Sequence, residues 1–282
     1  MSIYHESTIM HFQEITLLIK NIKRSLEFYQ EILGLQVIEQ FQNKTVLSAN
    51  RKDPLIILLE DRNAIPLGIT LGLYHFALLL PDRGSLAHVI KQLIDKRYPI
   101  TGASDHGVSE AIYLDDPDGN GIEIYKDRLE SEWPLEHGKM TMFTKPMDIE
   151  SVMKELPQTP YLNISEQTIM GHLHFHVGNL KDAEEFYSKA LGFQVVLNYM
   201  KSALFISDQG YHHHLGLNIW NGDAPLNGEK QVGLKSYVLV VPKENYPAFT
   251  RRLQDHRVTI LVDEHYKYLL DPLGQRIIIR VL

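Results

Sequence analysis

The stretch Asn21-Ile-Lys-Arg-Ser-Leu-Glu-Phe-Tyr-Gln-Glu-Ile-Leu-Gly-Leu-Gln-Val37 decides the fold, because the chain contains it twice. It occurs again as Asn179-Leu-Lys-Asp-Ala-Glu-Glu-Phe-Tyr-Ser-Lys-Ala-Leu-Gly-Phe-Gln-Val195, with nine identities in seventeen positions. A second pair of segments, Asp116-Pro-Asp-Gly119 and Asp271-Pro-Leu-Gly274, is repeated towards the end of each half. Repetition of this kind indicates an internal duplication.

The repeated stretch predicts a helix that ends at a glycine. Leu26, Tyr29 and Leu33 recur at the spacing of one apolar helix face. Gly34 stands where a C-terminal cap is common, so the helix is expected over residues 23–33. The strands around this helix are expected at residues 13–19, 36–41, 45–49 and 55–59. The first unit therefore has the order strand, helix and three strands (βαβββ).

The same order is expected three more times. The second unit begins with a strand near Tyr74, the third at His172 and the fourth at Lys235. Between residues 129 and 168 charge and proline increase and periodicity fades, which predicts a linker with one short helix over 148–155. We therefore expect an α+β protein with an N-terminal pair of units (1–128), a linker (129–168) and a C-terminal pair (169–282).

The composition restricts the class of protein. The 282 residues include no cysteine, which excludes disulfides, thiolate metal sites and cysteine nucleophiles. A net charge of −7 with scattered Lys and Arg favours no nucleic-acid partner. No apolar run is long enough to span a membrane and the first residues do not resemble a signal peptide, so we expect a soluble cytoplasmic protein. Fourteen histidines are unusually many and point to histidine chemistry.

Several motifs together resemble the vicinal oxygen chelate superfamily, which includes glyoxalases, bleomycin-resistance proteins and extradiol ring-cleaving dioxygenases. The resemblance rests on Leu26-Glu-Phe-Tyr29 with Leu33-Gly34, on residues 73–83, on residues 109–123, and on Gly171-His172 leading into Glu185-Phe-Tyr187. The segment 105–125 is most similar to bacterial catechol 2,3-dioxygenase-like proteins. The family fold implies four βαβββ modules that pair into two cup-shaped half-barrel sheets flanked by helices.

The resemblance also implies which positions bind a metal. In this family each module offers one ligand on its first strand and a carboxylate on its last, which here gives His75 and Glu123 in module two and His172 in module three. Module one offers Glu14, and module four offers only Ser236. Two imidazoles and one carboxylate suit Fe(II), with Mn(II) as an alternative. A triad of His75, Glu123 and His172 requires modules two and three to share one cup.

Further side chains are expected in the pocket by the same resemblance. Ring-cleaving relatives have a proton-transferring histidine near the last strand of module three, for which His214 is preferred and His213 is predicted to point the opposite way. Tyr113 matches a tyrosine that hydrogen-bonds the substrate, and His106 is a second candidate acid or base. Each also fits a structural role: Tyr113 suits a core aromatic, and the triple histidine suits a partly exposed strand start.

These residues favour an extradiol dioxygenase that opens a catechol- or hydroquinone-type aromatic ring with O2. A glyoxalase-type isomerase is the first alternative, in which Glu14, His75 and Glu123 hold Ni(II) or Zn(II) within the first half. A metal-free protein that binds an aromatic drug is the second. Edge strands of such folds commonly pair into homodimers, so a homodimer is a further expectation.

Overall fold

The computed structural model describes residues 3–282, in which the four modules are complete. Module one comprises β1 (His11–Ile19), α1 (Ile22–Leu26), η2 (Glu27–Ile32), β2 (Gln36–Phe41), β3 (Lys44–Ser48) and β4 (Ile56–Glu60). Module two comprises β5 (Gly72–Leu79), α2 (Arg83–Asp95), β6 (Gly102–Asp105), β7 (Ser109–Asp115) and β8 (Gly121–Asp127). A 3-10 turn, η1 (Ile3–His5), precedes β1.

The second half repeats this order. Module three comprises β12 (Ile169–His176), α4 (Leu180–Ala183), η4 (Glu184–Ala190), β13 (Gln194–Tyr199), β14 (Ala203–Ser207) and β15 (Leu215–Asn218). Module four comprises β16 (Gly233–Val241), α5 (Tyr246–Asp255), β17 (Leu261–Val262), β18 (Lys267–Leu270) and β19 (Arg276–Val281). The four βαβββ modules and the α+β class predicted from the sequence are confirmed.

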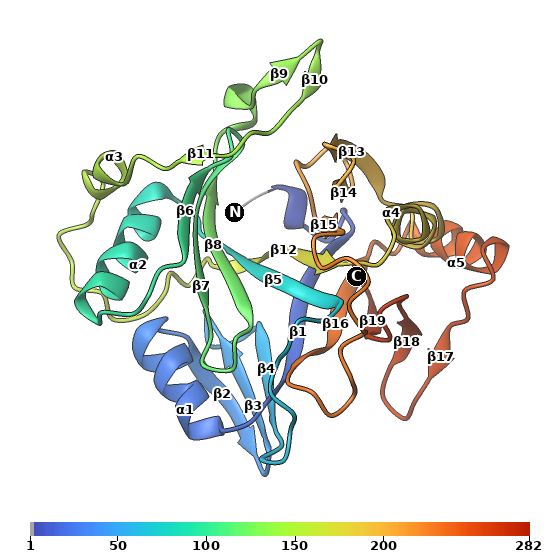
Figure 1. Cartoon of the computed structure of the whole chain (residues 1–282), viewed down its shortest axis with the longest axis horizontal. Helices are drawn as coiled ribbons and strands as arrows, with labels where there is room; N and C mark the ends of the chain where they lie inside the picture. The colour runs from blue at the N-terminus through green and yellow to red at the C-terminus, as the bar shows by residue number, and fades with distance from the viewer. Residues whose placement is uncertain (1–2) are drawn as a thin grey trace.

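The modules pair across the two halves of the sequence (Figure 1). The nine-stranded sheet has the order β11-β6-β7-β8-β5-β12-β15-β14-β13, which joins module two to module three. The eight-stranded sheet has the order β17-β18-β19-β16-β1-β4-β3-β2, which joins module four to module one. The central pairs, β5 with β12 and β1 with β16, are antiparallel. Modules two and three therefore share one curved sheet, as the proposed triad requires.

The duplicated helices differ from the prediction in one respect. In both copies the α-helix ends after the first turn and continues as a π-helix, η2 or η4. The wider turn closes with bonds from Leu33 N to Phe28 O and from Leu191 N to Phe186 O, both 3.0 Å. Asn21 and Asn179 cap the two helices with their side chains. Gly34, which ends the first, has a φ of +75°, as expected for a C-terminal glycine.

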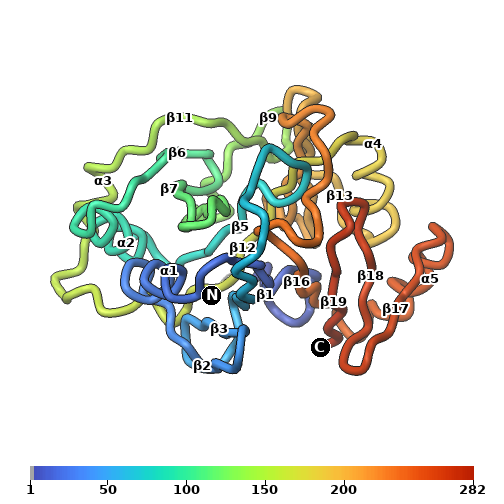
Figure 2. The backbone as a smooth tube through the Cα atoms, turned by 60° about the horizontal axis from the view of Figure 1, so that its bottom comes forward, coloured from blue at the N-terminus to red at the C-terminus, as the bar shows by residue number. Residues whose placement is uncertain are grey.

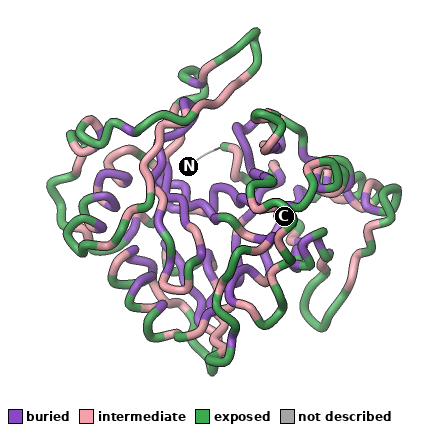
Figure 3. Tube along the Cα trace, in the orientation of Figure 1, coloured by how far each residue is buried: buried purple, intermediate pink, exposed green. Residues whose placement is uncertain are grey.

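A hydrophobic core lies between the sheets and under the helices. The ring of Tyr237 from β16 packs 5.4 Å from that of Phe12 on β1 and 5.5 Å from that of Phe175 on β12, so aromatic contacts join the sheets. Figure 2 shows β1, β12 and β16 running together through the centre of the molecule. In Figure 3 these strands are mostly buried, whereas the β9–β10 hairpin projects outward and is exposed.

The segment predicted as a linker contributes to the nine-stranded sheet. It contains η3 (Glu130–Glu132), β9 (Leu135–Glu136), β10 (Lys139–Met140), β11 (Lys145–Pro146) and α3 (Ile149–Met153). Strand β11 pairs with β6 at the sheet edge, and α3 packs against α2. None of the helices between residues 3 and 282 is long and apolar enough to cross a membrane.

Candidate metal centre

Three side chains from adjacent strands of the nine-stranded sheet meet at one point. Nε2 of His75 on β5 lies 3.0 Å from Oε2 of Glu123 on β8, and Nε2 of His172 on β12 lies 3.3 Å from the same oxygen. All three ligand atoms lie within 4.8 Å of one another. The structure thus brings together the three residues that the sequence predicted as a triad.

The donor set fits a metal ion. The three residues are 1–5% exposed. Neither nitrogen of His75 has a hydrogen-bond partner in the described part of the chain, although Nε2 lies close to the carboxylate. A buried polar atom without a partner costs free energy, and a cation between His75 and Glu123 would remove that cost. Two imidazoles and one carboxylate are the set that binds Fe(II) with open coordination positions.

The electrostatics favour the protonation states that bind metals. Burial raises the pKa of Glu123, but the neighbouring His172 and His75 outweigh it and hold that pKa well below its ordinary value. Burial lowers the pKa of His172, despite the opposing charge of Glu123. A carboxylate beside a neutral imidazole is the form in which both residues are ligands.

Glu14 does not join this cluster. It lies on β1 in the eight-stranded sheet, where Nη2 of Arg280 is 3.3 Å from its Oε2. The described residues contain one group of three or more potential ligands, and that group contains only His75, Glu123 and His172. The metal site that a glyoxalase-type mechanism would place on Glu14 is therefore not assembled here.

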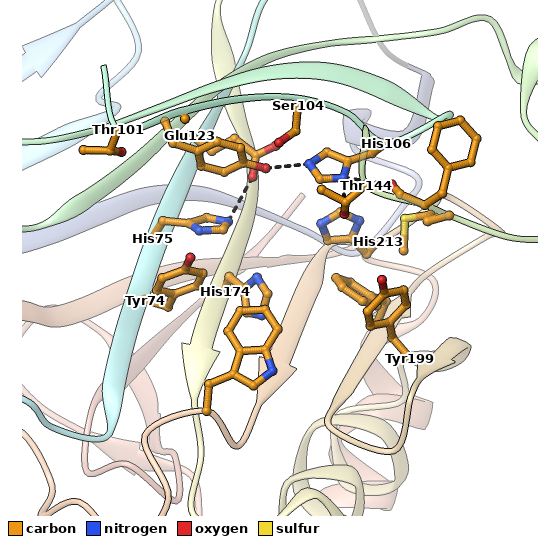
Figure 4. Close-up of a pocket in the computed structure, with 16 residues that line it drawn as sticks. Tyr74, His75, Thr101, Ser104, His106, Glu123, Thr144, His174, Tyr199 and His213 are labelled. Atoms are coloured by element: carbon orange, nitrogen blue, oxygen red, sulfur yellow. Dashed lines mark hydrogen bonds and ion pairs between the residues drawn. The ribbon is translucent and has the colours of Figure 1, made fainter. Parts of the chain in front are cut away.

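A pocket of about 470 Å³ opens over His75 and Glu123 (Figure 4). Its wall carries His106, Tyr113, His174 and His213 together with several aromatic side chains. The aromatic lining residues are Tyr74, Phe143, Tyr199, Phe205 and Trp220. Flat apolar walls around a few polar groups are typical of a site for a planar ring.

Tyr113 and His106 form a hydrogen-bonded pair in the pocket. Nδ1 of His106 lies 3.1 Å from the carbonyl oxygen of Phe143, which can only accept, so Nδ1 carries the proton. Nε2 of a neutral His106 then accepts from the Tyr113 hydroxyl at 2.7 Å. Burial and then the Glu123 charge raise the pKa of Tyr113 well above 10, so the hydroxyl stays protonated. The structure thus places both predicted residues in the wall.

His213, and not His214, lines the pocket. Nδ1 of His214 accepts from Asp208 N at 3.2 Å, and its Nε2 donates to Tyr4 O at 2.9 Å, so backbone groups hold both nitrogens. The expectation for His214 assumed strand alternation from residue 214. Strand β15 begins only at Leu215, and residues 211–214 are irregular, so alternation does not decide which ring faces the pocket.

His174 and His176 are held by Asn218 on the neighbouring strand. Nδ2 of Asn218 donates to Nε2 of His174 at 3.0 Å, and Nδ1 of His176 donates to Oδ1 of Asn218 at 2.6 Å. Gly216 on β15 leaves room for His174, since a Cβ at residue 216 would lie 2.8 Å from the imidazole. These contacts fix the ring of His174, which lines the pocket.

Sequence reasoning missed the pocket residues that come from the expected linker. Met142, Phe143 and Thr144 line the pocket, because β11 draws this segment along the edge of β6. The apolar run Met140-Thr-Met-Phe143 was the available signal. Tyr74, Tyr199 and Trp220 were also missed as pocket residues, because only folding brings them together around the pocket.

Comparison with known proteins identifies one matching family and two similar relatives. A family model described as the Glyoxalase/Bleomycin resistance protein/Dioxygenase superfamily matches residues 9–124. The chain is 41% identical over 280 residues to catechol-2,3-dioxygenase of Bacillus subtilis (strain 168), covering 97% of each protein. It is 29% identical over 110 residues to biphenyl-2,3-diol 1,2-dioxygenase 3 of Rhodococcus globerulus, covering 36% of this chain and 56% of the relative.

A solved structure shows the same fold at low identity. Glyoxalase I from Zea mays superposes with a TM-score of 0.58 and 14% identity, covering 96% of this chain and 92% of the other. At this identity the likeness concerns the arrangement of the modules and not the chemistry of the site.

Proposed function

Because the chain belongs to the glyoxalase/bleomycin resistance protein/dioxygenase superfamily, we propose that it is an extradiol dioxygenase that opens a catechol- or hydroquinone-type aromatic ring with O2. The observation that carries this proposal is the cluster of His75, Glu123 and His172 beneath an aromatic-lined pocket. The near-full-length similarity to a catechol-2,3-dioxygenase supports it.

The proposed cofactor is Fe(II), with Mn(II) as the alternative. Held by His75, Glu123 and His172, such an ion supplies a Lewis acid that lowers the pKa of a phenolic substrate, and an open face for O2. The three side chains are set on neighbouring strands of one sheet, so they require little rearrangement to act as ligands.

The wall residues then orient the substrate and move its protons. Tyr74 and Trp220, whose rings meet edge to face with centroids 5.6 Å apart, line the pocket and can contact a planar ring. Because the proton of Tyr113 points to Nε2 of His106, the Tyr113 oxygen is placed to accept a hydrogen bond from a substrate hydroxyl. His213 is the candidate that takes a phenolic proton and returns it later, because its ring lines the pocket beside His172.

The test is oxygen consumption by protein purified anaerobically and loaded with Fe(II) or Mn(II), with catechol as the probe. We expect O2 uptake and a product whose mass equals catechol plus one dioxygen. His75→Ala, Glu123→Ala and His172→Ala should each abolish uptake, whereas His265→Ala, at an exposed turn of module four, should not. Full activity in any of the three ligand variants would refute the proposal, as would turnover without oxygen uptake.

A further inference from the structure

A series of hydrogen bonds runs from the pocket histidine, His213, to the carboxylate of Asp127 at the end of β8. Nδ1 of His213 lies 2.8 Å from Nδ1 of His212, and Nε2 of His212 lies 2.8 Å from Oδ1 of Asp127. The His212 side chain is fully buried, whereas that of Asp127 is 17% exposed at a surface depression. The ligands and pocket residues described above do not include His212 or Asp127.

Asp127 acts only as an acceptor in this series of hydrogen bonds. Its second oxygen, Oδ2, accepts a hydrogen bond from the hydroxyl of Tyr211 at 3.0 Å. The hydroxyl oxygen of Tyr211 lies 2.8 Å from that of Tyr125. Because the proton of Tyr211 points to Asp127, Tyr211 accepts the hydrogen bond from the Tyr125 hydroxyl. Both carboxylate oxygens are thus occupied by donors, as suits an ionised carboxylate.

The order of donors and acceptors follows from that carboxylate. Because Asp127 accepts, Nε2 of His212 carries a proton, and Nδ1 of a neutral His212 is then a lone pair. That lone pair can only accept, so the proton in the contact between the two histidines belongs to Nδ1 of His213. Nε2 of His213 is left without a proton and is the nitrogen available to the pocket.

We propose that Asp127 and His212 are positioning residues that fix the tautomer of His213, so that His213 presents an unprotonated Nε2 to the substrate. This inference rests on the proposed function, in which His213 removes a phenolic proton. A base must offer a lone pair before it can accept a proton, so the opposite tautomer would present a donor and block that step. In Ser-His-Asp sites an aspartate that is hydrogen-bonded to a histidine likewise fixes the tautomer of that histidine.

The tautomer can be read directly by long-range ¹H–¹⁵N correlation spectra of the protein loaded with diamagnetic Zn²⁺. Loss of signals in His213→Asn assigns the resonances of His213. We expect Nδ1 of His213 to show the shift of a protonated nitrogen and Nε2 that of an unprotonated one. A proton on Nε2, or on both nitrogens of His212, overturns the proposal without any variant being needed.

The substitution Asp127→Asn should invert the tautomer. Tyr211 still donates to the amide oxygen, so the amide nitrogen faces His212 and donates to its Nε2. His212 must then carry its proton on Nδ1, and the proton of His213 moves to Nε2. With Fe(II) bound, kcat for catechol should fall roughly 10²-fold or more while KM changes little. An unchanged His213 spectrum in a folded Asp127→Asn protein contradicts the proposal.

Asp208→Asn is the matched control. Asp208 is buried and lies just before the same histidine segment, but its carboxylate accepts from Met10 N at 2.8 Å and takes no part in the hydrogen bonds that join His213, His212 and Asp127. This variant should keep the His213 tautomer, and inversion there too would count against a specific role for Asp127. The experiments distinguish failure of the proposed dioxygenase function from failure of the proposed positioning role. The expected tautomer of His213 without oxygen uptake refutes only the dioxygenase function. Oxygen uptake with a protonated Nε2 of His213 refutes only the positioning role of Asp127 and His212.

Discussion

The hydroxyl of Tyr29 donates a hydrogen bond of 2.8 Å to the buried carboxylate of Asp116. The duplicated pair, Tyr187 and Asp271, makes the same contact at 2.9 Å. In each case the tyrosine comes from the repeated helix of one module and the aspartate from the turn of the next, and these two modules belong to different sheets. The two segments that reveal the duplication in the sequence therefore also hold the sheets together.

Removing that contact should destabilise the fold. Tyr29→Phe keeps the buried ring but takes one donor from the Asp116 carboxylate, which should lower the free energy of unfolding by about 1–3 kcal/mol. Urea denaturation at neutral pH measures the change. Tyr266→Phe, at a half-exposed position, is the control and should be neutral within about 0.5 kcal/mol. A Tyr29→Phe protein as stable as the wild type would show that the contact contributes nothing.

The duplicated turn should also make stability depend on pH. Burial raises the pKa of Asp271 to about 6, against an ordinary value of 3.8, although backbone and tyrosine donors oppose it. The contribution of Asp271 to the free energy of unfolding is therefore full below about pH 4, where the group is protonated, and is lost as pH rises through 6. Since each pKa unit corresponds to about 1.4 kcal/mol, the loss is ~3 kcal/mol. Asn cannot ionise, so the free energy of unfolding of Asp271→Asn relative to wild type should increase by that amount between pH 4 and 7. A difference between the two proteins that stays constant with pH would refute the raised pKa of Asp271.

Metal binding should depend on both halves of the chain. Wild type should bind close to one Fe(II) or Mn(II) per chain and show a higher unfolding temperature in its presence, because the ion binds only the folded state. His172→Ala should lose both effects, whereas Glu14→Ala should keep them. The measurement is metal content after desalting, together with thermal unfolding. The reverse pattern, with Glu14 essential and His172 dispensable, would place the site in the first half and favour a glyoxalase-type enzyme.

The two neighbouring histidines should differ in what they affect. His213→Gln should lower kcat by roughly 10²-fold or more, with metal content unchanged, because it removes the pocket base. His214→Gln should mainly cost stability, about 1–3 kcal/mol, since its ring satisfies the backbone at Asp208 and Tyr4. Steady-state kinetics and denaturation on both variants decide the matter. The opposite division of effects would make His214 the functional histidine.

The segment between the halves should influence substrate affinity. Phe143 forms part of the pocket wall, so Phe143→Ala should raise KM for an aromatic substrate by roughly tenfold and alter kcat much less. His137→Ala, in the exposed β9–β10 hairpin of the same segment, is the matched control and should leave both constants unchanged. An unaltered KM in Phe143→Ala would mean that the wall at β11 does not contact the substrate.

The local features of the fold were predictable from the sequence. Gly34 marks the end of the first helix through short-range capping, and the strand lengths follow from short apolar runs. The resemblance to the superfamily implied His75, Glu123 and His172 as candidate ligands, and segments such as the turn before Glu123 set their alignment with the family positions. The π-helical turns were not predicted, since their apolar spacing differs little from that of an α-helix.

Other properties were decided only by the tertiary structure. The pairing of β5 with β12 brings His75 and His172 together. It depends on contacts between residues about a hundred positions apart, and the register of such a long-range pairing cannot be predicted from one sequence. The choice of His213 over His214 depends on an irregular segment, where side-chain direction has no fixed period. The sequence thus determined each module, because modules follow from local hydrogen bonding and periodicity, and its resemblance to a known superfamily implied the candidate ligands. Long-range strand pairing decided which modules share a site and which side chains face it.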